Sequence, residues 1–246
     1  MKATRLEPEF VPRPWGSETW FRAGSDSPLL IKFLETFDKL SVQVHPPDSY
    51  ARRHENSSGK TEMWHITAAR PGAQVAVGFR VAQTRESVLC GIRTGEIESQ
   101  MNWLDVRSGD TIYVEAGRIH TIGAGVSLCE IQQNSDVTYR LYDYGRKREL
   151  HLEKGLDVCS LEPYDGRRAL PVRCEYFHTE EIFWTEPLRY HPIRPPEHFL
   201  VVLSGSGTIG NEWFEAGHVW FVEPAAGVLD VVPDSPPHLL RSWRPY

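Results

Sequence analysis

The sequence predicts a mainly β protein, built as a β-sandwich or a jelly-roll barrel. Short runs of apolar or alternating residues recur along the chain between turns rich in Gly, Pro and Asn, as expected for closely spaced strands. One stretch, residues 85–103, instead has apolar residues at helical spacing. The chain has 246 residues, of which 40% are hydrophobic, so it can bury a full core in one large or two small domains.

The expected strands are short runs bounded by turn residues. Residues 111–114, for example, lie between the turns Gly109-Asp110 and Ala116-Gly117. The expected strands in the first part of the chain are residues 30–33, 40–44, 63–67, 74–79, 111–114, 127–132 and 139–142. The apolar residues of the helical stretch are Val88, Ile92, Ile97 and Met101. We expect this stretch to form a small helical excursion across one end of the barrel.

Two histidines, a glutamate and a glutamine stand in these strands or at their ends. Gln43 and His45 are two residues apart in an alternating apolar run, so both project from the face opposite the valines of LSVQVH. Glu62 and His120 would come from two further strands. Such a set of nitrogen and oxygen donors indicates a mononuclear metal site.

The residues around this set resemble the type I mannose-6-phosphate isomerases (phosphomannose isomerases), zinc cupins that interconvert mannose 6-phosphate and fructose 6-phosphate. The resemblance is carried by LLIKFLETFDKLSVQVHPPDSYARRHENSSGKTEMWHI and VEAGRIHTIGAGVSLCEIQQNSDVTYRLYDYGR, and covers residues 29–153 densely. It implies a double-cupin arrangement of jelly-roll barrels. It also implies one Zn²⁺ per chain, with Gln43, His45, Glu62 and His120 as its ligands. The residues that fall at the family's pocket positions are Lys32, Ser41, Lys60, Glu130, Asp136 and Arg140.

The chemistry accounts for these residue types. Moving a carbonyl between C1 and C2 of a sugar transfers a proton through an enediolate, and a divalent cation stabilises the charge that develops. Nitrogen and oxygen ligands favour zinc, although other divalent metals can substitute. We expect Arg140, Lys60 and Glu130 to be catalytic, with Glu130 as the candidate general base. We expect Lys32, Ser41 and Asp136 to bind the substrate.

Simpler interpretations of the pocket residues remain open. Lys32 can be an edge-strand residue with its ammonium in solvent, and Arg140 can pack on the tyrosines of TYRLYDYGR. Asp136 can be a turn residue, and Glu130 can orient a metal ligand instead of acting as the base.

Two alternative functions also stay open. One is a cupin with the same metal pocket and a different chemistry, such as an epimerase or a dioxygenase; the other is a sugar-binding cupin without turnover. Lys32, Lys60 and Arg140 argue against an oxygenase, which needs no cations to balance a phosphate. The chain departs from the family in the short segment between Trp15-Gly16 and residue 29, and in lacking a long helical insertion.

A second strand pattern follows the proline-rich segment HPIRPPEH at residues 191–198. Aligning Gly109 with Gly217 places Val228 opposite His120, so this half has lost that ligand. We therefore expect two domains. Residues 1–160 would form the metal-binding cupin domain, and residues 161–246 a degenerate, cupin-like half without metal ligands, with the boundary between residues 161 and 196.

The composition indicates the expected setting of the protein. A net charge of −6 does not suggest a nucleic-acid partner. The four cysteines are widely spaced, as in a reduced cytoplasmic protein, and neither a secretory leader nor an apolar stretch long enough for a membrane span is evident. We expect a cytoplasmic monomer or homodimer whose partner is a small sugar phosphate, with no membrane or nucleic-acid partner.

Overall fold

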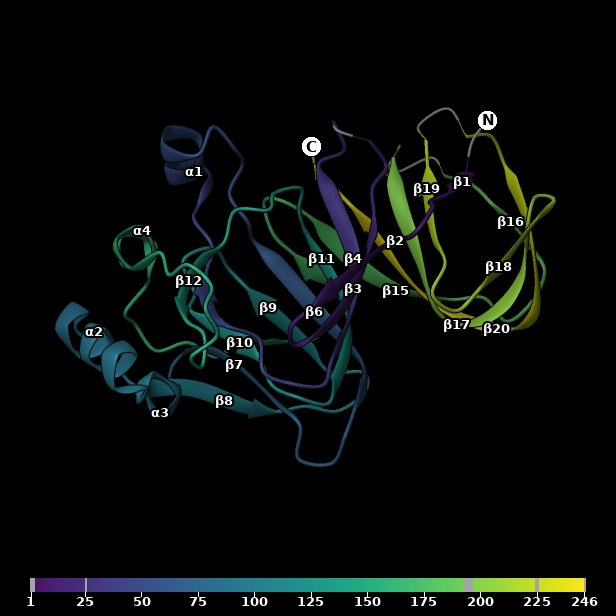
Figure 1. Cartoon of the computed structure of the whole chain (residues 1–246). Coiled ribbons are helices and arrows are strands. Elements are labelled where there is room, and N and C mark those ends of the chain that lie inside the picture. Colours follow the sequence, from purple (N-terminus) through teal and green to yellow (C-terminus); the bar gives the residue numbers. More distant parts are fainter. Residues whose placement is uncertain (1–2, 25, 193–196, 224–225, 246) are drawn as a thin grey trace. The chain divides into compact units, whose positions relative to one another are not determined.

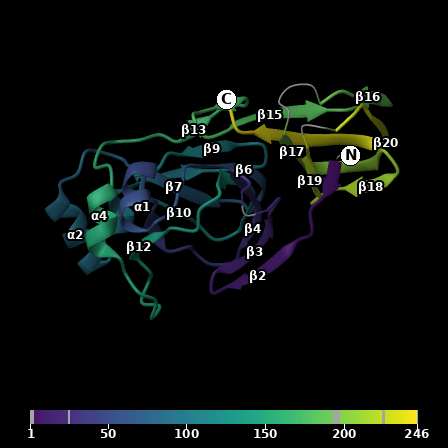
Figure 2. The ribbon, with the colours of Figure 1, turned by 90° about the horizontal axis from the view of Figure 1, so that it is seen from above.

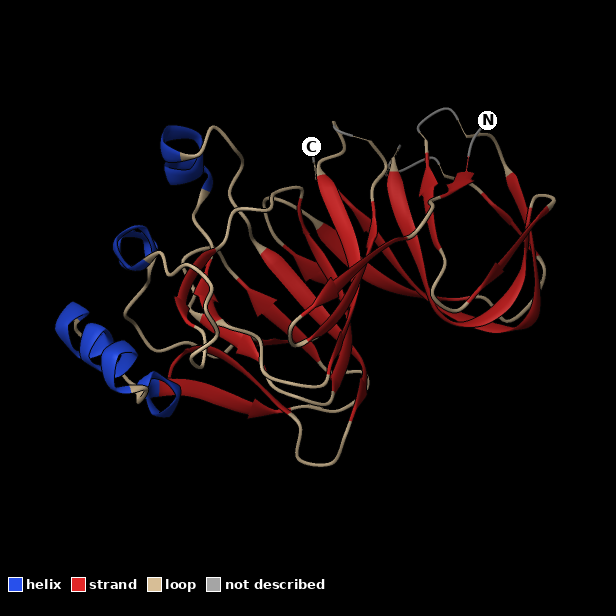
Figure 3. Cartoon of the chain, in the orientation of Figure 1, coloured by secondary structure: helices blue, strands red, loops and turns tan. Residues whose placement is uncertain are grey.

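The computed structural model of the chain describes residues 3–24, 26–192, 197–223 and 226–245. Strands dominate the fold, and the few helices are short (Figures 1 and 3). The strands form three sheets of eight, five and seven strands, all built from antiparallel pairs in the named ladders. The mainly β class is confirmed.

The chain divides into two units that are both discontinuous in sequence. One unit consists of Met1–Glu9, Trp20–Ile31 and Ala169–Tyr246, and the other of Phe10–Thr19 and Lys32–Arg168. The domain boundary at residues 160 and 161 remains a prediction. The unit that contains the C-terminal residues also includes two segments from the N-terminal part of the chain.

Two sheets build the unit that contains residues 32–168. The seven-stranded sheet has the order β13 (Arg167–Arg168), β9 (Thr111–Val114), β6 (Glu62–Ala69), β11 (Val126–Gln133), β4 (Leu29–Thr36), β3 (Gly16–Phe21) and β2 (Glu9–Arg13). The five-stranded sheet has the order β12 (Tyr139–Tyr142), β5 (Val42–Val44), β10 (His120–Ile122), β7 (Gln74–Phe79) and β8 (Met101–Asp105).

Alternation along the strands separates polar from apolar positions inside this unit. On β6, Glu62, Trp64 and Ile66 follow one another at every second position, and on β10 His120 is followed in the same way by Ile122. Trp64, Ile66 and Ile122 join one buried apolar cluster. The polar first residues of both strands therefore lie at one end of this core, which is where the candidate site forms.

The described residues form four helices beside these sheets: α1 (Asp48–His54), α2 (Arg85–Thr94), α3 (Ile97–Gln100) and α4 (Leu152–Val158). Apolar residues of α2, α3 and α4 pack against the valines of β5 in a second buried cluster. The short α1 and α4 were not predicted. Each buries at most two residues, so neither has a long apolar periodicity.

The helical excursion predicted at residues 85–103 is found as two helices, α2 at residues 85–94 and α3 at residues 97–100, separated by a turn. Thr84 and Ser87 form a capping box at the start of α2, and Gly95 ends the helix with φ 83°. The helical assignment is wrong for Met101 and Trp103. Both lie in β8, because these residues pair with β7.

The strands predicted in the first part of the chain are present, three of them with the predicted ends. Residues 74–79, 111–114 and 139–142 match β7, β9 and β12, and residues 30–33, 63–67 and 127–132 lie within longer strands. Strand β5 is shorter than predicted, because Leu40 and Ser41 precede it and only Val42–Val44 pairs with its neighbours.

An eight-stranded sheet forms most of the other unit (Figure 2). Its order is β1 (Ala3–Arg5), β19 (Val219–Val222), β17 (His198–Ile209), β20 (Leu229–Trp243), β15 (His178–Phe183) and β14 (Val172–Arg173), with β16 (Leu188–Tyr190) paired to β20 and β18 (Glu212–Glu215) paired to β17. The strand pattern expected after residue 198 is therefore found. Residues 193–196 of the proline-rich segment and residues 224–225 of the last turn lie outside the described residues.

None of the helices in the described part of the chain combines the length and the apolar character that crossing a membrane requires.

Candidate metal centre

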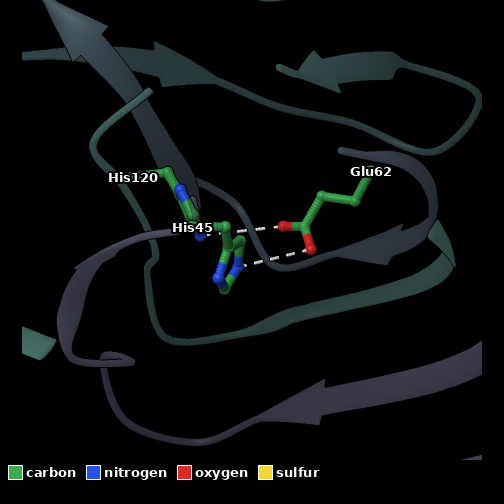
Figure 4. Close-up of side chains that lie close together, drawn as sticks. All are labelled: His45, Glu62 and His120. Atoms are coloured by element: carbon green, nitrogen blue, oxygen red, sulfur yellow. Dashed lines mark ion pairs between the residues drawn. The ribbon is translucent and has the colours of Figure 1, made fainter. Parts of the chain in front are cut away.

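Three buried side chains meet at the polar end of the core. His45 follows β5 directly, and Glu62 and His120 are the first residues of β6 and β10. Figure 4 shows both imidazoles turned toward the Glu62 carboxylate, and one ligand atom from each residue lies within 4.8 Å of the other two. Gln43 joins them, because β5 pairs with β10 so that Gln43 lies opposite His120.

The spacing of these atoms suits a single ion. His45 Nε2 lies 3.5 Å from Glu62 Oε2, and His120 Nε2 lies 3.7 Å from Glu62 Oε1. The Gln43 amide nitrogen is 3.2 Å from His120 Nε2. Zinc ligands at about 2.0–2.2 Å in a tetrahedron are roughly 3.3–3.6 Å from one another. The two histidine contacts of 3.5 and 3.7 Å are close to this spacing, and they reach different oxygens of Glu62.

Ser41 is placed to orient the Gln43 amide. The Ser41 hydroxyl donates to Gln43 Oε1 at 3.3 Å. A half-turn of the amide exchanges its oxygen and nitrogen, after which Nε2 donates to Ser41 Oγ and Oε1 faces the His120 side. The buried serine satisfies the amide in both orientations, so Gln43 can offer a neutral oxygen ligand.

Backbone carbonyls fix both imidazoles in the metal-binding tautomer. His45 Nδ1 donates to the carbonyl of Val137 at 3.0 Å, and His120 Nδ1 donates to that of Arg118 at 2.8 Å. A carbonyl only accepts, so the proton lies on Nδ1 and Nε2 carries the lone pair. Burial lowers the pKa of His120 to about 4, and burial with the charge of Lys60 lowers the pKa of His45 well below its usual value. Both rings are therefore neutral at pH 7.

Buried charges of both signs surround the ligands. Lys60 Nζ lies 2.6 Å from Glu62 Oε2 and 3.7 Å from Glu130 Oε1. Lys32 Nζ lies 3.2 Å from Glu130 Oε1 and 3.8 Å from Glu18 Oε2. Arg13 Nε also lies 2.8 Å from Glu18 Oε1. With all of these side chains ionised, three carboxylates face three cations, so these charges balance.

The two carboxylates that share Lys60 differ in acidity. Burial and the charge of Glu130 raise the pKa of Glu62. Burial by itself would raise the pKa of Glu130 as well, but the charges of Lys60 and Lys32 outweigh it and lower that pKa. Glu130 is therefore ionised at neutral pH.

Two residues that the sequence did not single out belong to this cluster. The Trp64 indole donates to Glu62 Oε1 at 3.1 Å and to Glu130 Oε2 at 3.2 Å. Its place two residues after Glu62 on a strand is a signal that could have found it. Glu18 comes from β3, and only the tertiary fold brings it to Lys32.

Arg140 and Asp136, the other predicted site residues, lie in the part of the chain that follows β11. Arg140 is paired with Gln43 in the register of β12 and β5, and its Nη1 donates to the carbonyl of Glu149 at 2.9 Å. Its buried Nε has no hydrogen-bond partner among the described residues. Asp136 lines an open cavity of about 800 Å³ and precedes Val137, whose carbonyl holds His45.

Sequence comparison finds relatives among curated proteins. "Mannose-6-phosphate isomerase" of Streptococcus mutans is 42% identical over 140 residues, which cover 54% of this chain and 44% of the relative. "Mannose-6-phosphate isomerase ManA" of Bacillus subtilis is 46% identical over 154 residues, which cover 60% of this chain and 49% of the relative. "Putative mannose-6-phosphate isomerase YvyI" of Bacillus subtilis is 35% identical over 210 residues, 77% of this chain and 65% of the relative. The chain thus spans about half the length of the first two relatives. No family model matches.

Solved structures share the fold over nearly the whole chain. The mannose 6-phosphate isomerase of Bacillus subtilis has a TM-score of 0.87 at 22% identity and covers 99% of this chain and 100% of its own. A mannose 6-phosphate isomerase bound with zinc and yttrium has a TM-score of 0.76 at 12% identity. The match covers 99% of this chain and 100% of that structure's chain. At such identities the likeness concerns the fold, and it confirms the expected cupin architecture.

Proposed function

We propose that this chain, a homologue of the type I mannose-6-phosphate isomerases, is a zinc-dependent isomerase that interconverts mannose 6-phosphate and fructose 6-phosphate. The observation that carries the proposal is the buried juxtaposition of His45, Glu62 and His120 within 4.8 Å, beside the charged pair of Lys60 and Glu130. All of these residues lie in the segment that resembles the isomerases.

Gln43, His45, Glu62 and His120 would hold the ion. Neutral imidazoles, a carboxylate and an amide are ligand types that suit zinc, and manganese, iron or cobalt can replace it at such donors. When bound, the metal supplies electrophilic polarisation of the sugar carbonyl.

Glu130 is the proposed proton carrier between C1 and C2. Its carboxylate is ionised and is held by Lys32 at 3.2 Å, so it can accept a proton from one carbon and return it to the other through an enediolate. A proton acceptor that is fixed by buried cations keeps one orientation during both transfers. Trp64 contacts the other oxygen of the same carboxylate.

Lys60 and Arg140 are the proposed electrostatic stabilisers. Lys60 is buried and has a raised pKa, because the charges of Glu130 and Glu62 more than offset the cost of burial. It therefore stays cationic where negative charge develops on the sugar oxygens. Arg140 adds a second cation from β12.

Lys32, Ser41 and Asp136 are the proposed substrate-binding residues. Lys32 brings a cation toward an anionic substrate, and the Ser41 hydroxyl and the Asp136 carboxylate can hydrogen-bond to sugar hydroxyls.

Incubation of the zinc-loaded protein with mannose 6-phosphate in D₂O, followed by proton NMR, tests the proposal. We expect fructose 6-phosphate to form with deuterium at the exchanging carbon. The C2 epimer as the product would indicate an epimerase. Zinc binding without either product or exchange would indicate a sugar-binding protein and contradict the proposal.

A further inference from the structure

The indole of Trp64 lies between the two carboxylates of the site. On β6, Trp64 is two residues after Glu62 and projects from the same face, and β11 places Glu130 directly opposite Trp64. The indole N–H is within hydrogen-bond distance of one oxygen of each carboxylate, 3.1 Å from Glu62 Oε1 and 3.2 Å from Glu130 Oε2. The side chain is buried, so water does not compete for this donor.

The remaining two oxygens of these carboxylates face the Lys60 ammonium. Lys60 Nζ is 2.6 Å from Glu62 Oε2 and 3.7 Å from Glu130 Oε1. Each carboxylate therefore has one oxygen toward the indole and the other toward the ammonium. A quarter-turn of either carboxylate about its last torsion would break both contacts, since its two oxygens would leave the line between the indole and the ammonium.

A third contact ties the indole to the imidazole pair. The ring of Trp64 meets that of His120 edge to face, with centroids 5.7 Å apart. Glu62 Oε1, which accepts from the indole, is also the oxygen that lies 3.7 Å from His120 Nε2. Trp64 thus touches two proposed zinc ligands and the proposed base.

We propose that Trp64 is a positioning residue that sets the orientation of the Glu62 carboxylate for the metal and of the Glu130 carboxylate for proton transfer. The inference rests on the proposed function for the roles of Glu62 and Glu130. An indole suits this place because it donates a hydrogen bond without adding charge. Lys60 already places one positive charge 2.6 Å from Glu62, and a second cationic donor would add to the repulsion of a metal ion.

Trp64→Phe tests this role, because it removes the N–H group and keeps an apolar ring. Trp220→Phe is the matched control: Trp220 is equally buried, and its indole nitrogen has no hydrogen-bond partner among the described residues. The first measurement is the zinc dissociation constant by competition with a chromogenic chelator. We expect Trp64→Phe to weaken zinc binding about 10- to 100-fold and Trp220→Phe to leave it within about twofold.

The visible spectrum of the cobalt-substituted proteins is the second measurement. A shift of the cobalt bands in Trp64→Phe but not in Trp220→Phe reports a changed ligand arrangement, which loss of stability alone would not produce. Should Trp64→Phe fold poorly, Trp64 can be replaced by benzothienylalanine, which keeps the shape of indole and lacks the N–H donor. Wild-type zinc affinity and cobalt spectrum in that protein would overturn the inference.

Turnover measured on the same proteins separates this inference from the proposed function. Suppose that neither the wild type nor the variants isomerise the sugar, but Trp64→Phe binds zinc more weakly than the wild type. That result would support the positioning role toward Glu62 and refute the isomerase. An active wild type, with Trp64→Phe and Trp220→Phe equal to it in zinc affinity, spectrum and kcat, would refute the positioning role and leave the isomerase intact.

Discussion

At the scale of single residues, the neutral imidazoles depend on backbone carbonyls behind them. The carbonyls of Arg118 and Val137 accept from the Nδ1 atoms of His120 and His45, and this leaves Nε2 of each ring to face Glu62. The lone pair of each ring is thus on Nε2, and that of His45 accepts from the Lys60 ammonium at 3.1 Å.

His120→Ala should remove metal binding and activity while the fold is kept, since the strands and not the ion provide most of the buried contacts. The matched control is His54→Ala, an exposed histidine outside the cluster. Metal analysis and thermal unfolding with added zinc check this. Zinc at about 100 times its Kd should stabilise the control by about 2.7 kcal/mol and leave His120→Ala unchanged. Full zinc occupancy in His120→Ala would disprove the ligand assignment.

The pH dependence of zinc binding should follow Glu62 and not the histidines. Burial and the charge of Glu130 raise the pKa of Glu62 to about 7, whereas burial lowers the pKa of His120 to about 4. A carboxyl group must lose its proton to bind a cation, so the apparent zinc affinity should increase as the pH rises through 7 and then level off.

Calorimetry in two buffers with different ionisation enthalpies measures the protons released on zinc binding. Close to one proton should be released at pH 6 and almost none at pH 8, because the imidazoles are already neutral at both values. Release of two or more protons at pH 6 would mean that the imidazoles are protonated in the metal-free protein, contrary to their burial.

Arg140→Ala should lower kcat on the order of 10²-fold while zinc remains bound, because the proposed role of Arg140 is charge stabilisation and not metal binding. Arg148→Ala is a suitable control, as Arg148 pairs with the buried Asp143 instead. Steady-state kinetics with metal analysis decides the matter. Unchanged turnover in Arg140→Ala would make Arg140 a packing residue.

At the scale of elements, a tight loop between α1 and β6 positions Lys60. Gly59 donates to Asp48 Oδ1 at 2.8 Å, and Lys60 donates its backbone N–H to the carbonyl of Pro46 at 3.1 Å. A side chain at residue 59 would bring its Cβ within 2.5 Å of the Asp48 nitrogen. The loop therefore requires glycine for its close approach.

Gly59→Ala should lower the free energy of unfolding by about 1–3 kcal/mol and reduce turnover, because the loop must shift to relieve the contact and Lys60 moves with it. Urea denaturation and kcat measure the two effects. Gly227→Ala is the control, since a Cβ there meets no atom within 4 Å. Equal stability and turnover in both variants would show that the loop yields without displacing Lys60.

The strands, and the side chains that meet at the end of the core, could be predicted because alternation is a local signal. Gln43 and His45 alternate with Val42 and Val44 along the chain, so the sequence already shows which of these side chains share a face. The position of Glu18 beside Lys32 depends on how β3 and β4 lie in the sheet, which no local pattern encodes. The helical assignment of Met101 failed for the same reason, since pairing with β7 overrode the apparent periodicity.

At the scale of the whole molecule, the polar site belongs to one unit of a chain whose units are interleaved in sequence. The strand pattern predicted two β-rich halves. The assignment of Met1–Glu9 and Trp20–Ile31 to the unit of the C-terminal residues could not be predicted, because it depends on pairings such as that of β1 with β19, far apart in the sequence.

Val228→Ala should leave zinc at one ion per chain, because Val228 is a partly exposed residue at the position that aligns with His120. Metal analysis of the variant beside the wild type measures this. A halved zinc content would mean that the second half carries a metal site of its own.

A coupled assay of the purified, zinc-loaded protein beside a chelated sample tests most directly whether this buried cluster converts mannose 6-phosphate in a metal-dependent reaction. We expect fructose 6-phosphate to form, the chelator to abolish its formation, and added zinc to restore it. Equal turnover with and without the chelator, or no turnover with one zinc bound per chain, would contradict this expectation.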